Sequence, residues 1–141
     1  MISILPEVAQ FLHNQNVGIF TPTTATGNIF IETKPDKPDI AICLFTTAGL
    51  PDAELFPEDA LGFQVIIRGN FDASIAFSLA AAVYDKLHGF RKGKLITTGT
   101  YIISIMGLQT PVSIGKDEKK RQEYSINFIA RVSGNNTNRG Y

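Results

Sequence analysis

The residues best suited to chemistry in this sequence are one cysteine and two histidines. Cys43 is the only cysteine, so the chain can form neither an intramolecular disulfide nor a thiolate cluster for a metal. It lies in the apolar run 40–45, which predicts a buried, inert thiol. His13 and His88 each fall at the end of an expected helix, where solvated side chains are more common than ligands or bases. These residues therefore predict no catalytic residue, no metal site and no cofactor.

Acidic and basic side chains gather in separate segments. Residues 49–60 contain two prolines and four acids without a base, so we expect a long acidic loop. The acids in this loop are Asp52, Glu54, Glu58 and Asp59. We interpret them as a solvated surface rather than a catalytic pair, because such carboxylates are mostly exposed. The connector 90–94 is basic and carries Arg91, Lys92 and Lys94.

The charge of the whole chain is zero, but it is divided unevenly. Residues 1–70 carry three bases and eight acids, a net −5, whereas residues 71–141 carry ten bases and five acids, a net +5. Opposite charges on the two halves favour head-to-tail association of copies, with the acids at 52–59 of one copy approaching the bases at 86–94 of the next. The alternative is that the two halves interleave in the fold, which would cancel the asymmetry.

A second charged segment, 116–121, mixes both signs. Gly115 and Lys116 lack the rest of a phosphate-binding loop, and the run lacks the aromatic residues that accompany nucleic-acid binding. A net charge of zero also gives no general attraction for DNA. We expect an exposed hairpin that contacts a partner, with a free, solvated hairpin as the alternative. The residues assigned to this contact are Asp117, Lys119, Lys120 and Arg121.

Two helices and several strands must position these segments. Apolar spacing predicts a helix over 3–16, and a second helix begins at the cap Asp72 and ends before Gly89. Strands are predicted at 28–33, 39–46, 61–69, 100–108 and 124–132, with a turn at 35–38 joining the first two. This order is typical of an α+β domain: a mainly antiparallel β-sheet, two helices packed on one face and a β-hairpin extension. We expect a single domain over 1–132 and a flexible tail over 133–141.

No apolar run is long enough to cross a bilayer, so no membrane partner is expected. The N-terminus lacks the basic residues and the cleavage pattern of a signal peptide. We therefore expect the chain to be made and assembled in the cytoplasm.

Several short motifs between Phe63 and Val132 occur in an order that resembles a known family. They are the strand 64–69 ending in Arg-Gly, the Ala-rich helix closing on 85–89, Pro111 with Ile114-Gly115, the hairpin 117–121, and the strand start 124–128. Together they resemble the bacteriophage minor capsid family that includes tail terminators and tail-to-head joining proteins. One departure is the hairpin tip, where the usual glycine is replaced by Lys119 or Lys120.

The resemblance implies a structural virion protein without catalytic activity. It implies a homo-oligomeric ring, usually of six subunits, at the head-proximal end of a tail tube. Such a ring would stop tube growth and contact the tube protein and the neck or connector proteins, and DNA would at most pass through its lumen. Two alternatives stay open at this point: a head-completion or connector protein of the neck, and a small α+β enzyme or ligand-binding domain. The latter needs a pocket with converging polar groups.

Overall fold

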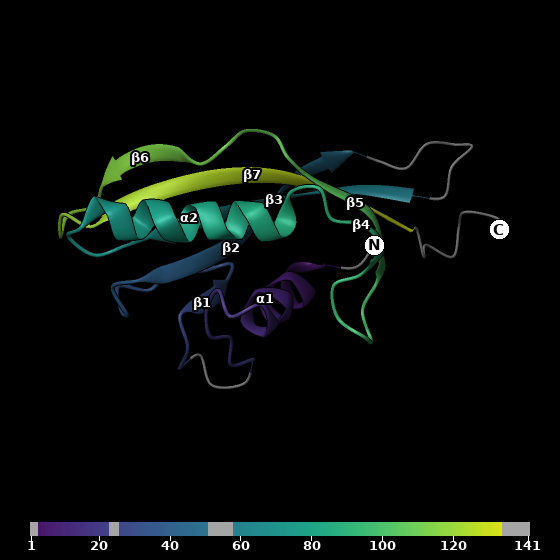
Figure 1. Cartoon of the computed structure of the whole chain (residues 1–141), viewed down its shortest axis with the longest axis horizontal. Coiled ribbons are helices and arrows are strands. Elements are labelled where there is room, and N and C mark those ends of the chain that lie inside the picture. Colours follow the sequence, from purple (N-terminus) through teal and green to yellow (C-terminus); the bar gives the residue numbers. More distant parts are fainter. Residues whose placement is uncertain (1–2, 23–25, 51–57, 134–141) are drawn as a thin grey trace.

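The computed structural model describes residues 3–22, 26–50 and 58–133, and these form two helices and one seven-stranded sheet (Figure 1). The elements are α1 (Leu5–Asn14), β1 (Ile29–Ile31), β2 (Ala41–Leu50), β3 (Glu58–Arg68), α2 (Ala73–Leu87), β4 (Arg91–Lys94), β5 (Tyr101–Gly107), β6 (Val112–Lys116) and β7 (Gln122–Ser133). The strand order is β1-β2-β3-β7-β5-β4, and β6 pairs with β7. The predicted α+β fold is confirmed. Neither helix is long and apolar enough to span a bilayer in the part of the chain described here.

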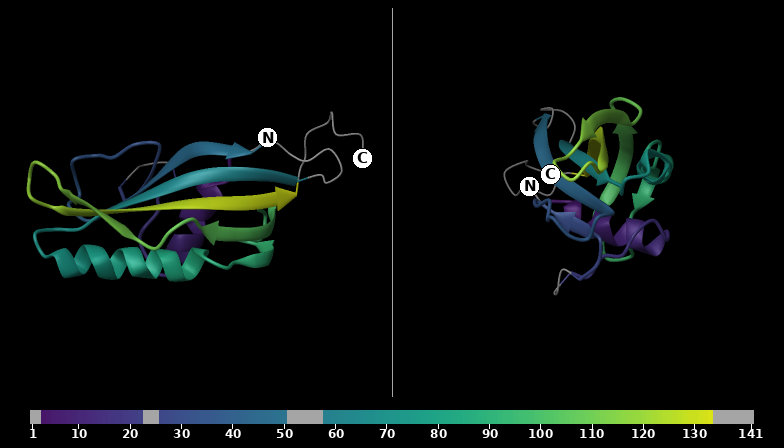
Figure 2. Two further views of the ribbon diagram at one scale, coloured as in Figure 1. Left: turned by 90° about the horizontal axis from the view of Figure 1, so that it is seen from above. Right: turned by 90° about the vertical axis from the view of Figure 1, so that its left-hand side faces the viewer.

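Both helices cover the same face of the sheet, as the two views of Figure 2 show. The alternating residues of β7 supply Ile126, Phe128 and Ala130 to this side, as their period of two predicts. Phe128 stacks on Phe63 of β3 with ring centroids 5.1 Å apart. The small residues Ala76, Ala80 and Val83, together with Leu87, form the buried face of α2 and let the helix lie close to the sheet.

The ends of the helices follow from local chemistry. Asp72 caps α2, because its Oδ1 accepts a hydrogen bond from the backbone N–H of Ser74 at 3.0 Å. Gly89 follows the helix in the left-handed region at φ 84°, which glycine adopts without strain. The end of α1 differs from the prediction. It stops at Asn14, where Asn16 turns the chain at φ 62°, before Gly18 is reached.

Strand pairing corrects three sequence predictions. The strands on either side of the turn 35–38 are parallel, with Ile29 opposite Ile42. The basic connector is the edge strand β4, which pairs with β5. The expected acidic loop is shorter than 49–60, because β2 extends to Leu50 and β3 begins at Glu58. Backbone hydrogen bonds to a distant strand stabilise these segments whatever their side chains. Residues 51–57 and 134–141, and with them Asp52, Glu54 and nearly all of the expected tail, lie outside the described residues.

The sheet keeps the two halves of the sequence apart. Strands β1, β2 and β3 come from the acidic half and lie together on one side. Strands β4, β5, β6 and β7 come from the basic half and lie on the other side. The alternative in which the halves interleave is therefore wrong for the strands of the sheet.

Candidate assembly surfaces

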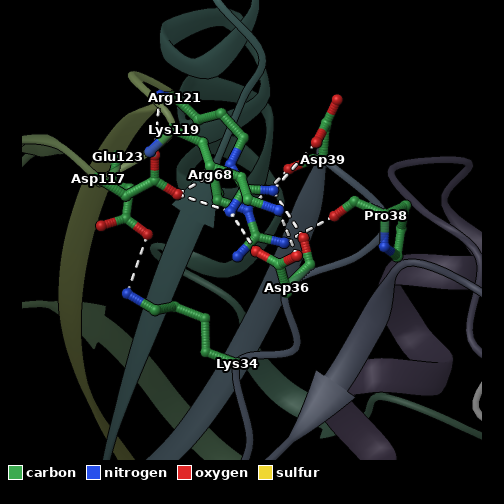
Figure 3. Close-up of polar contacts among 9 residues, drawn as sticks. All are labelled: Lys34, Asp36, Pro38, Asp39, Arg68, Asp117, Lys119, Arg121 and Glu123. Carbon is green, nitrogen blue, oxygen red and sulfur yellow. Dashed lines mark hydrogen bonds and ion pairs between the residues drawn. The ribbon is translucent and has the colours of Figure 1, made fainter.

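The charged hairpin between β6 and β7 is tied to the β1–β2 connection by Arg121 (Figure 3). The Arg121 side chain is only 4% exposed, and its Nη1 donates to the backbone oxygen of Asp36 at 2.6 Å. The same guanidinium pairs with three carboxylates: Asp36 at 3.1 Å, Asp39 at 3.0 Å and Asp117 at 2.7 Å. We call these four residues the Arg121 clamp. It joins segments that are more than 80 residues apart in the sequence.

Asp117 also determines the shape of the turn. Its Oδ1 accepts hydrogen bonds from the backbone N–H groups of Lys119 at 3.0 Å and Arg121 at 2.9 Å. Lys120 adopts φ 64°, a conformation that glycine favours. Of the two residues at the hairpin tip, Lys120 therefore has the backbone conformation of a glycine, and the hydrogen bonds to Asp117 stabilise the turn.

Two further contacts fix the β1–β2 connection against the uncovered face of the sheet. Arg68 is 2% exposed, and its guanidinium donates to the backbone oxygens of Asp39 at 2.8 Å and Pro38 at 2.6 Å. Lys34 pairs with Glu123 of β7 at 2.9 Å. The β1–β2 connection is thus held by ion pairs and hydrogen bonds to charged residues of both sequence halves. These charged residues find their partners within one copy.

The surroundings of the clamp keep its carboxylates ionised. Burial opposes ionisation of Asp117, but hydrogen bonds from Arg121 and the backbone, together with the Arg121 charge, outweigh it and lower the pKa of Asp117 to about 2. The hydrogen bond from Lys119 lowers the pKa of Asp36 as well, with a further contribution from Arg121.

Acid should therefore weaken the clamp. The folded pKa of Asp117 lies below its ordinary value of 3.8, so its ionised form stabilises the fold above about pH 4, and this stabilisation is lost as the pH falls toward 2. We expect the free energy of unfolding of the wild-type chain to fall more steeply over that range than that of Asp117→Asn. Urea denaturation at a series of pH values measures both slopes. Equal slopes would mean that Asp117 does not carry this dependence.

Of the four predicted hairpin residues, the structure places two at the surface and two in contacts within the chain. Lys119 and Lys120 are exposed, as expected. The prediction is wrong for Arg121, which is buried in the clamp, and Asp117 is largely covered. No local pattern pointed to Asp36 or Asp39, because only the fold brings them to the hairpin, and Arg68 stood out only as part of the Arg-Gly motif. Contact between the hairpin and a partner stays a prediction.

The basic residues of β4 form a second surface. The side chains of Arg91, Lys92 and Lys94 are exposed, and none of them pairs with a carboxylate among residues 3–22, 26–50 and 58–133. Within one copy Gly93 lies in register with Asp59, three strands away, which is about 14 Å. Asp59 is only 3% exposed, so it does not belong to an accessible acidic surface. The fold therefore leaves the β4 cations available to another molecule.

The residues with reactive side chains serve the fold. Cys43 is fully buried, as predicted, and burial raises the pKa of its thiol to about 11. The prediction of solvated histidines is wrong. Nδ1 of His13 accepts a hydrogen bond from Phe20 N at 3.1 Å, and Nδ1 of His88 accepts one from Gly107 N at 2.9 Å. Both half-buried imidazoles thus hold backbone N–H groups of neighbouring segments.

An open groove of about 500 Å³ lies between the end of α1 and α2. It is lined by Gln15, Asn16, Val17, Ser74, Ile75, Ser78, Leu79, Ala82 and Lys86. Lys86 is the one charged side chain in this lining, so the groove offers no set of acids and bases that converge on a substrate. In the described ranges, no three His, Cys, Asp or Glu side chains are grouped to hold a metal ion.

Known proteins share both the sequence pattern and the fold of this chain. The model of the family described as bacteriophage tail terminator protein matches residues 11–133. A chain in the solved structure of the virion of a native gene transfer agent particle has a similar fold, with a TM-score of 0.66 and 17% identity. The match covers 94% of this chain and 96% of that one. No curated protein matches the sequence. The family match spans most of the chain and confirms the resemblance found in its motifs, so this protein belongs to the bacteriophage tail terminator family.

Proposed function

We propose that this protein forms a ring of six copies that ends a phage tail tube and joins it to the neck. The family supports a structural role in a phage tail. In this role the chain is a virion protein assembled in the host cytoplasm. It catalyses no reaction, and DNA at most passes through the lumen of the ring.

The observation that carries the proposal is the division of the sheet into two unlike sides. One side consists of strands from the acidic half and the other of strands from the basic half. A surface that is complementary to a different surface of the same molecule forms head-to-tail contacts, and such contacts close into rings when the rotation between copies allows it. A closed ring leaves no edge for a further copy.

Charge pairing between neighbours follows from the same division. The exposed cations of β4 in one copy would face Asp52, Glu54 and Glu58 of the next copy. Asp59 no longer belongs to this set, because it is buried in β3. The exposed Lys119 and Lys120 at the hairpin tip would contact the tube or the neck.

The role itself is tested by particles assembled without the chain. We expect tails of uncontrolled, excessive length in electron micrographs, because nothing would stop addition of tube subunits. Normal tails attached to heads that leak DNA would contradict a terminator and indicate the neck connector instead. Antibody labelling of intact virions should place the chain between head and tail.

The charge pairing is tested by reversal and restoration. Arg91→Glu, Lys92→Glu and Lys94→Glu in combination should weaken the ring, and more strongly at low salt, where charges are least screened. Adding Asp52→Lys, Glu54→Lys and Glu58→Lys to the same chain should restore the ring. The mass of the assembly in solution at low and high salt measures both effects. An oligomer unchanged by the first set at low ionic strength would refute the pairing.

A further inference from the structure

The sheet protects some of its edges and leaves others open. Unpaired N–H and C=O groups of an edge strand attract other strands, so proteins usually cover such edges or place charges on them. The outer edge of β1 is covered, because Asn28 N and Ile29 N both donate to Ile19 O, at 2.9 and 3.1 Å. The edge strand β4 carries three cations, and Lys92 bends it at φ 52°. Both edges are protected against chance pairing.

The strand β6 is not covered by other described residues, and its single charge, Lys116, lies at its end. It pairs only with β7 in the described part of the chain, and it lies beside α2 at the surface (Figure 1). Val112 and Ile114 are 46% and 49% exposed. On the helix-covered face, Phe77 of α2 is 53% exposed and contacts Tyr124, the partner of Ser113, whereas Val112 pairs with Ser125 and points to the other face. An open, apolar edge of this kind is typical of a strand that pairs with another chain.

A second open edge lies on the opposite side of the sheet. Strand β1 pairs only with Ile42–Leu44, so the later part of β2 has no strand beside it among the described residues. This segment, Thr46–Gly49, is uncharged and largely exposed. At its start, Glu32 accepts hydrogen bonds from Thr46 N and Oγ1, both at 2.6 Å. The carboxylate of Glu32 therefore already accepts from the first N–H of this edge, and the open part begins after it.

We propose that β6 of one copy pairs with Thr46–Gly49 of the next copy, so that the sheet continues from subunit to subunit. The inference rests on the proposed ring and names its interface. The position beside β6 is vacant in the described residues, because β4 lies only against β5. The β2 strand of the next copy would lie two strands away from β7, as β4 does, so the two strands would follow one another along one line. The end of this β2 strand would then point toward β4, where the proposed charge pairing takes place.

Symmetry determines the direction of the pairing. Strand β6 runs in the same direction as β3, since both are antiparallel to β7, whereas β2 runs in the opposite direction. In a ring, each copy is related to the next by rotation about the ring axis. If that axis is inclined by less than a right angle to the strands, a given strand runs in nearly the same direction in both copies. Strand β6 and the β2 strand of the neighbour therefore meet antiparallel. The C-terminal end of β6 then lies beside the start of the open edge. This brings Lys116, which has no carboxylate partner among the described residues, next to Glu32.

The offset between the two edges determines how strongly the strands of a closed ring would tilt. Through the sheet register, β6 lies level with Ala41 to Cys43 of its own copy, whereas the open edge is centred near Ala48. Pairing them shifts successive copies by six or seven residues, which is about 21 Å along the strands, while four strand spacings give about 19 Å across them. The strands would tilt by about 48° from the ring axis, slightly more than the 35–45° found in closed sheets.

Engineered disulfides test the interface directly. Both strands have a register shift at this level in their own pairing, between Ser113 and Gly115 and between Thr47 and Leu50. With Lys116 opposite Thr46 and these two shifts opposite each other, Ile114 lies opposite Ala48, at a Cα separation that a disulfide can span. We expect oxidation of assembled particles carrying Ala48→Cys and Ile114→Cys to convert the monomer band on a non-reducing gel into a ladder that ends at the closed ring. Cys43 is fully buried and stays out of the reaction. Neither single variant should cross-link.

The controls separate the interface from the ring. Ladders from Ala48→Cys with Lys92→Cys, or dimers from Ile114→Cys alone, would overturn the β6–β2 pairing. Virions that contain the double variant but show no ladder would overturn the interface and leave the ring intact. Virions that lack the wild-type chain would overturn the proposed function itself.

A charge variant gives a second measurement that does not depend on new cysteines. Lys116→Glu would place a carboxylate beside Glu32 of the neighbour and should weaken the ring several-fold at low salt. Lys37→Glu is the matched control, because Lys37 is exposed and lies outside both paired strands, in the β1–β2 connection. Equal weakening by both variants, or no weakening by Lys116→Glu, would count against the register.

Discussion

Replacing Arg68 with methionine is expected to lower the free energy of unfolding by about 3 kcal/mol. Arg68 is 2% exposed and donates to the backbone oxygens of Pro38 and Asp39. A hydrogen bond from a charged donor contributes roughly 1.5–3 kcal/mol, and both would be lost. Methionine recovers part of this loss because it avoids desolvating a guanidinium. We expect the two lost bonds to outweigh that gain, since the carbonyl groups would be left without a donor.

Urea denaturation measures the loss in the free energy of unfolding, and two further variants show which property of Arg68 causes it. Arg68→Lys keeps the charge but replaces the planar fork with a single ammonium, so its loss should be intermediate. Arg91→Met removes an exposed arginine of the edge strand β4 and should change the stability by less than about 0.5 kcal/mol. An Arg68→Met chain as stable as the wild type would show that the desolvation cost of the guanidinium cancels its hydrogen bonds.

Replacing Phe128 with alanine is expected to cost about 4 kcal/mol. Phe128 is fully buried in the central strand β7, where its ring stacks on Phe63 with the planes 16° apart. Alanine removes the apolar contact and leaves a cavity that two helices and a sheet cannot close. The loss approaches the whole stability of an ordinary domain, which is about 5–15 kcal/mol. Strand β7 also holds β6, so assembly should fail together with folding.

Phe77→Ala is the matched control, because the same side chain is removed from an exposed position on α2. Its loss should stay below about 1.5 kcal/mol, the upper range for one aromatic pair, here with Tyr124. Phe128→Leu keeps most of the apolar volume and should fold if Phe128→Ala does not. Similar midpoints of urea denaturation for Phe128→Ala and Phe77→Ala would contradict the assigned core.

Local signals in the sequence were sufficient for several elements. The apolar spacing of α2, its cap Asp72 and the following Gly89 predicted that helix almost to the residue. The alternation in β7 predicted which side chains face the helices. These signals succeed because helix and strand periods, caps and turns depend on residues within a few positions of one another. The burial of Cys43 followed from its apolar neighbours in the same way.

What the sequence by itself determined is therefore the class of fold, the limits of α2, the inward face of β7 and the family motifs. Only the tertiary structure decided that β1 and β2 are parallel, that Arg121 is buried against Asp36 and Asp39, and that β6 and the end of β2 are left as open edges. The physical reason is distance along the chain. Strand partners, buried ion pairs and open edges depend on which remote segments meet, and no period or motif within one segment carries that information.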